Sequence, residues 1–177
     1  MLIDKYLSAY DFNEFHSIKV NASAEGSYDK MLRCDVGRSR LVSFLFRLRG
    51  IPKHLYTIDH LTRMGFAKLD EEPGKEIVYG IVTTSPVFKS CQSNFSPASF
   101  LQNKDASVMK AVINFRVQDV NSLTHIISTE TRVWCGSKRL KARFGAYWFF
   151  VKPFSGFIRK QMLKQIRRQV VKPTTER

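Results

Sequence analysis

One uninterrupted helical pattern, from about residue 138 to residue 171, constrains the fold more than any other feature of the sequence. At 1.5 Å per residue it makes a rod of about 50 Å, whereas a folded chain of 177 residues is about 40 Å across. Pro153 lies within the pattern, where its ring clashes with the preceding turn and it donates no backbone hydrogen bond. We therefore predict a helix that bends near residues 149–152.

Apolar residues cover most of the circumference of the first half of this helix. A second stripe, Tyr147, Phe150, Phe154 and Phe157, runs beside the main one. The main stripe consists of Phe144, Trp148, Val151, Ser155, Ile158, Met162, Ile166 and Val170. A helix of this kind must be covered on more than one side, so we predict that its aromatic half is buried. The second half carries its basic residues off the main stripe: Arg159, Lys160, Lys164, Arg167 and Arg168.

A strand and two short helices are predicted near the start of the chain. Residues 14–20 alternate in polarity, as a strand with one covered face does. Asn21 or Ser23 can cap a helix over residues 24–34, and a second helix fits residues 40–50. The rest of the chain before the long helix is predicted to be mostly β.

Four further strands are predicted over residues 64–70, 75–84, 108–120 and 123–135. The last two are rich in β-branched residues, and "QDVNS" is typical of a hairpin turn between them. Residues 85–107 are polar and are predicted to hold one short strand and a loop. The result is an α+β fold in which a curved antiparallel sheet wraps on a long C-terminal helix.

This order of elements resembles the START-like helix-grip superfamily, also named SRPBCC, of the polyketide cyclase/dehydrase and lipid transport type. Four segments resemble an uncharacterised bacterial branch of it: "SRLVSFLFRLRG", "GFAKLDEEPGKEIVYGIV", "STETRV" and "FGAYWFFVKPFSGFIRKQML". The resemblance spans residues 14 to 168. It implies the fold and an internal ligand cavity, but no particular reaction. The sequence departs from the branch after "YGIV", where "TTSPVF" replaces an expected Trp.

The chain carries a net charge of +14, and most of it lies near the C-terminal end. Residues 132–177 hold thirteen Lys or Arg and one acid, so their net charge is +12. Such asymmetry favours an anionic partner, although a solvated basic face explains it equally well. A membrane surface touching residues 159–168 is one such partner. Nucleic acid is disfavoured, because the helix over 40–50 has an apolar face where a recognition helix needs a polar one.

Cavity-lining residues are predicted from both the helix and the sheet. The apolar and aromatic ones are Tyr79, Ile113, Phe115, Phe144, Tyr147, Trp148 and Val151. Glu130 and Arg132 share one face of a strand and can orient a ligand carbonyl or carboxylate, or else form a surface pair. Arg143 lies one helical turn before Tyr147 and is either a polar anchor of the ligand or a solvated charge.

Three functions remain open on the sequence alone. The first is the binding of a hydrophobic or amphipathic small molecule in the cavity. The second is an enzyme of the cyclase or dehydratase kind that uses Glu130 or Tyr147 as acid or base, and the third is a lipid-handling protein on a membrane surface. No catalytic motif, metal site or cofactor site is predicted.

The chain is predicted to be a single domain over residues 1–177, with its core over 14–171. Its first residues lack the basic start and apolar run of a signal peptide. No run of about eighteen apolar residues is present, so a cytoplasmic location is expected. The sequence gives no prediction of oligomeric state.

Overall fold

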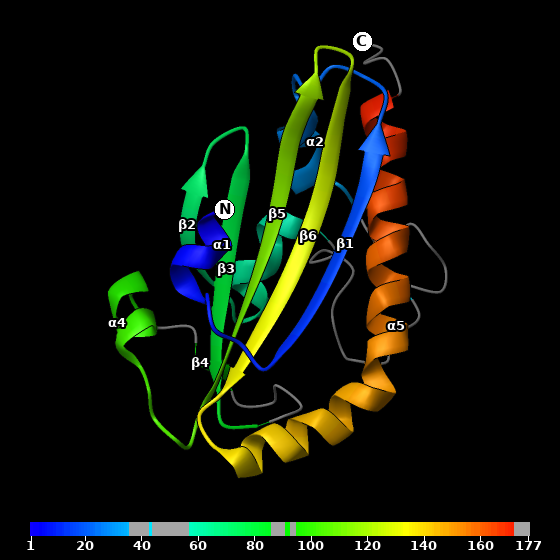
Figure 1. Cartoon of the computed structure of the whole chain (residues 1–177). Helices are drawn as coiled ribbons and strands as arrows, with labels where there is room; N and C mark the ends of the chain where they lie inside the picture. Colours follow the sequence, from blue (N-terminus) through cyan, green and yellow to red (C-terminus); the bar gives the residue numbers. More distant parts are fainter. Residues whose placement is uncertain (36–42, 44–56, 86–90, 93–94, 172–177) are drawn as a thin grey trace.

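A curved antiparallel sheet and one long helix form the frame of the molecule (Figure 1). The computed structural model describes residues 1–35, 43, 57–85, 91–92 and 95–171. Within these ranges the strand order is β1-β6-β5-β3-β2, and β4 pairs with β3. The strands are β1 (Phe12–Val20), β2 (Ala67–Glu72), β3 (Glu76–Thr83), β4 (Cys91–Gln92), β5 (Met109–Asn121) and β6 (Thr124–Cys135). Together with helix α5 (Lys138–Val171), they confirm the predicted helix-grip fold.

Helix α5 runs over the predicted residues and is bent. Figure 1 shows it as two arms, one across an end of the sheet and one alongside β1. Pro153 lies inside the helix, as the predicted kink requires. The bend keeps a helix of 34 residues in contact with a sheet that a straight rod would overhang.

The short helices differ from the prediction in three places. Helix α2 (Ser27–Leu32) begins only after Gly26, whose φ of 67° is left-handed, so neither Asn21 nor Ser23 is its N-cap. Helix α4 (Pro97–Gln102) occupies the predicted loop, and Ser96 and Ser99 form a capping box at its start. Helix α1 (Leu2–Tyr6) lies before the predicted core. Apart from Ser43, the helix predicted over 40–50 lies outside the described residues. A 3-10 helix, η3 (Ile58–Met64), precedes β2.

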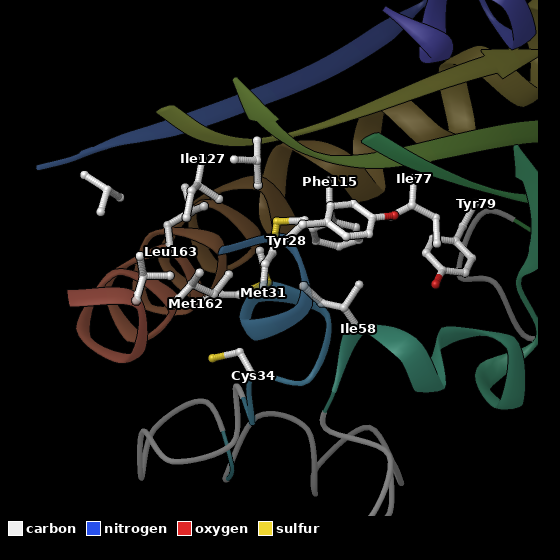
Figure 2. Packing of buried hydrophobic residues seen from close by; sticks show 14 residues of the cluster. Tyr28, Met31, Cys34, Ile58, Ile77, Tyr79, Phe115, Ile127, Met162 and Leu163 are labelled. Carbon is white, nitrogen blue, oxygen red and sulfur yellow. The ribbon is translucent and has the colours of Figure 1, made fainter. Parts of the chain in front are cut away.

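The concave face of the sheet packs against α5, α2 and η3. Figure 2 shows Met162 and Leu163 of α5 together with Met31 of α2, Phe115 of β5 and Ile127 of β6 in one buried cluster. These side chains are between 0% and 7% exposed. The second arm of α5 is therefore held on the sheet by a continuous apolar core.

The opposite, convex face is covered as well. Ile3 and Tyr6 of α1 and Phe100 of α4 pack with Val78 of β3 and Val112 of β5. All eight residues of β3 are buried, which is the pattern of a strand covered on both faces. The sheet is thus covered on both sides at β3, whereas the convex side of β1 is exposed, and only the concave side of the sheet faces α5.

Candidate ligand-binding site

A cavity of about 190 Å³ lies between the concave face of the sheet and the bent part of α5. Its apolar walls come from both layers. They consist of Phe66, Ile81, Ala111, Ile113, Val133, Phe144, Tyr147, Trp148 and Val151. Three polar residues, Thr131, Ser155 and Arg159, complete the lining. The cavity is therefore amphipathic, with an apolar wall and a small hydrogen-bonding part.

Stacked rings build the apolar wall. Phe144 is fully buried, and its ring stacks on that of Trp148 with 5.7 Å between centroids. Tyr147 is 5.9 Å from Phe144, and Phe12 of β1 meets the same ring edge-on at 5.0 Å. Such ring pairs are held by their quadrupoles as well as by apolar burial. The wall is thus a set of mutually fixed rings rather than loose side chains.

A buried polar cluster forms around Arg159 and joins α5 to the sheet. The Arg159 guanidinium donates to the hydroxyls of Thr131 at 2.7 Å, Thr129 at 3.3 Å and Ser155 at 3.4 Å. Glu14 of β1 lies 3.6 Å from the Arg159 Nε, and it accepts a hydrogen bond from Ser155 at 2.8 Å. These contacts fix the guanidinium between α5 and β6.

The same cluster shields its charges from water. The side chains of Glu14 and Arg159 are 5% and 13% exposed. Burial lowers the pKa of Arg159, while the neighbouring Glu14 carboxylate acts in the opposite sense. Glu14 also lies 2.9 Å from the Nε2 atom of His16. Gly156 lets α5 approach this closely, since a Cβ there would be 3.0 Å from the Glu14 Oε1.

Five of the predicted site residues line this cavity: Ile113, Phe144, Tyr147, Trp148 and Val151. The structure places the other predicted residues elsewhere. Tyr79 and Phe115 belong to the buried cluster beneath the second arm of α5, and burial raises the pKa of Tyr79 to about 12. Arg143 is exposed on the first arm. Only part of the predicted set is thus brought together.

Glu130 and Arg132 do not reach the cavity, because they face the convex side of the sheet. Adjacent residues of a strand point to opposite faces, and it is Thr131 that lines the cavity. The Arg132 Nε donates to Glu130 at 2.8 Å, and its Nη1 atom contacts the Leu7 carbonyl at 3.0 Å and Asp4 at 2.8 Å. The pair therefore anchors the N-terminal segment to the back of the sheet. This placement does not support an acid or base role for Glu130 in the cavity.

A second buried carboxylate extends this convex-face network. Glu76 accepts from the backbone N–H groups of Leu2 at 3.0 Å and Ile3 at 3.3 Å, at the start of α1. The Asn114 amide donates to Glu76 at 2.7 Å and accepts from the Glu130 N–H at 2.8 Å. These contacts satisfy free N–H groups of the first helical turn, so this polar network is structural.

The side chain of Arg159 is only 13% exposed, although the sequence pattern grouped it with the basic residues off the main apolar stripe. The missed signal is its spacing. Arg159 follows Ser155 by four residues and Val151 by eight, so the three share one face of α5. A basic residue at that spacing from an apolar stripe is a candidate for a buried charge.

The prediction that the whole aromatic half of α5 is buried is wrong. The exposed fractions are 76% for Phe149, 71% for Phe150, 59% for Phe154 and 36% for Phe157. The sheet covers one side of α5, which accounts for the burial of Phe144 and leaves these four rings in contact with water. No helix among the described residues is long and apolar enough to cross a membrane.

Comparison with known proteins gives only remote likenesses. No protein-family model matches the chain, and no curated protein matches its sequence. A conserved protein from Geobacillus kaustophilus is 11% identical, with 90% of this chain and 95% of that chain covered and a TM-score of 0.36. Norcoclaurine synthase from Thalictrum flavum, in complex with dopamine and hydroxybenzaldehyde, is 14% identical, with 93% and 89% covered and a TM-score of 0.39.

The di-domain ARO/CYC protein BexL of the BE-7585A biosynthetic pathway is also similar. It is 12% identical, with a TM-score of 0.36, and the match covers 90% of this chain and 46% of BexL.

Proposed function

We propose that the protein binds a small apolar or amphipathic molecule in the cavity between the sheet and α5. The observation that carries this proposal is a cavity with stacked aromatic rings on its wall and a few partly buried polar groups. Ligand sites are typically concave, mostly apolar and oriented by a small number of polar groups. The resemblance noted in the sequence implies the same kind of internal site.

The size of the cavity limits the ligand. Its 190 Å³ is less than the roughly 300–1,000 Å³ of pockets for drug-sized molecules. A single ring with a short side chain, or a short aliphatic chain, therefore suits the site better than a whole lipid with two acyl chains.

Filling the cavity tests the proposal. Val151→Trp places an indole into the void from α5, whereas Val171→Trp adds the same side chain at the helix end, where Val171 is 54% exposed. Native mass spectrometry of protein purified from its own host should show a bound small molecule in the wild type and in Val171→Trp. The molecule should be absent from Val151→Trp. An empty wild-type protein, or equal occupancy of Val151→Trp, would contradict cavity binding.

A second candidate function, attachment to an anionic membrane surface, is favoured by the exposed phenylalanines of α5. These rings lie on a helix with ten Lys or Arg and no acidic residue. Interfacial helices insert Phe side chains among lipid headgroups and hold the surface through Lys and Arg. Each basic residue near an anionic leaflet contributes about 1 kcal/mol. Apolar rings and cationic flanks are thus combined on one element.

Vesicle pelleting separates this candidate from a merely solvated helix. The wild type should pellet with vesicles of phosphatidylglycerol and phosphatidylcholine at low salt, and less at high salt because the charges are screened. Phe150→Ser with Phe154→Ser should pellet less. Phe15→Ser, a change at a 53% exposed ring on β1, serves as the control and should not differ from the wild type. Equal pelleting of all three proteins would refute docking through these rings.

A further inference from the structure

The Arg159 guanidinium is hydrogen-bonded only to hydroxyl groups among the described residues. Its three bonds, to Thr129, Thr131 and Ser155, use three of the five N–H groups that a guanidinium carries. Glu14, at 3.6 Å from Nε, lies beyond normal hydrogen-bond length. The guanidinium therefore lies near the Glu14 carboxylate without donating a hydrogen bond to it.

The Glu14 carboxylate is satisfied by other groups. One oxygen accepts from the Ser155 hydroxyl at 2.8 Å, and the other lies 2.9 Å from the His16 ring nitrogen. Glu14 thus balances the charge of Arg159 at short range but leaves its terminal N–H groups to other acceptors. Since a buried charge is costly unless it is both paired and hydrogen-bonded, these N–H groups favour a further oxygen acceptor.

Arg159 also borders the cavity, together with its partners Thr131 and Ser155. We propose that it is the anchor for a carboxylate head of the ligand, whose apolar body lies against the rings of Phe144 and Trp148. This inference rests on the proposed cavity binding and adds the chemical class of the ligand. A guanidinium suits a carboxylate because two of its N–H groups match the two carboxylate oxygens.

A pair of probes that differ in the head group alone tests the assignment. We would measure, by isothermal titration calorimetry, the binding of 3-phenylpropanoate and of 3-phenylpropanol to the same proteins. The wild type should bind the acid about tenfold or more tightly than the alcohol, as charge-assisted hydrogen bonds require. Arg159→Gln should bring the two affinities to within about twofold, mainly by weakening the acid. Arg167→Gln, a change at an exposed arginine of the same helix, should keep the wild-type preference.

Removing Arg159 alone leaves Glu14 buried without its counter-charge, which can unfold the protein. A second variant is therefore needed. Glu14→Gln with Arg159→Gln removes both charges together, which avoids an unpaired buried carboxylate. This double variant should fold, bind the alcohol like the wild type and lose the preference for the acid. Its thermal unfolding, measured beside binding, separates a lost head-group contact from a lost fold.

The outcomes distinguish the two proposals. Equal binding of acid and alcohol by the wild type, or an unchanged acid preference in the folded double variant, would overturn the role of Arg159 while cavity binding stands. Binding of neither probe would also overturn it if native mass spectrometry still finds a ligand that Val151→Trp excludes. A protein that binds neither probe and carries no ligand would end both proposals.

Discussion

Replacing Arg132 by Met should destabilise the protein strongly without changing the cavity. Arg132 and Glu130 are each 7% exposed on the convex face. Without the guanidinium, Glu130 keeps only the Asn13 amide at 3.3 Å as a side-chain partner among the described residues. The Leu7 carbonyl also loses its donor at 3.0 Å. The change therefore leaves a buried carboxylate nearly unpaired.

The expected magnitude follows from that arrangement. Removing one partner of a buried ion pair costs about 3–5 kcal/mol of unfolding free energy. For a chain of this size each kcal/mol lowers the Tm by about 2–4 °C, so the Tm should fall by about 6–20 °C. Glu130→Gln with Arg132→Met removes the unpaired charge. We expect this double variant to be about 1–3 kcal/mol more stable than the sum of the two single changes predicts.

Urea unfolding of the wild type, both single variants and the double variant measures this coupling. A cost below about 1 kcal/mol for Arg132→Met would refute the reasoning, because it would equal that of an exposed surface pair. Binding of 3-phenylpropanoate by the folded variant is the second readout. It should match the wild type, and a selective loss would show that Arg132 acts on the cavity side.

Further predictions concern α5 and α1. Gly156→Ala should destabilise the protein by about 1–3 kcal/mol, since its Cβ would lie 3.0 Å from the Glu14 Oε1 and the buried Glu14 is held in place by Ser155 and His16. Gly145→Ala, whose Cβ meets a ring at an ordinary 3.5 Å, should be neutral or stabilising by up to about 1 kcal/mol. Thermal unfolding compares the two, and an equal cost would contradict close packing at Gly156. The hydrogen bond from Arg132 lowers the pKa of Asp4 below its ordinary value of 3.8. The stability that Asp4 contributes is therefore fully present above pH 3.8 and is lost as the pH falls through the lowered pKa. In urea titrations, Asp4→Asn should therefore be less stable than the wild type at neutral pH. The difference in unfolding free energy should shrink below pH 3.8, and a difference that stays constant with pH would contradict this linkage.

The sequence predicts that successive side chains of a strand point to opposite faces of the sheet. It does not show which of the two rows of side chains faces α5. Glu130 and Arg132 form one row of β6, and Thr129 and Thr131 form the other. If one face of the sheet were exposed to water, one of the two rows would consist mainly of polar residues. Here α1 covers the convex face and all four residues are largely buried, so both rows look like candidates for the cavity. The sequence pattern predicts no helix before residue 14, and without α1 the role of the Glu130 row cannot be derived.

The helical period of α5 predicted which residues share a side of the helix, but it could not show how many layers cover that helix. Phe144 and Phe150 belong to neighbouring stripes, yet one is 0% and the other 71% exposed. Arg159 differs in the opposite way, because a basic residue expected in solvent lies between α5 and β6. Both errors have one cause. The burial of a side chain depends on the surface that packs against the helix, and the sequence pattern of a helix describes the helix but not that surface. In the second proposed function, the exposed rings beside the basic residues are the groups that contact a partner, and the vesicle experiment on Phe150 and Phe154 decides whether that partner is a membrane surface.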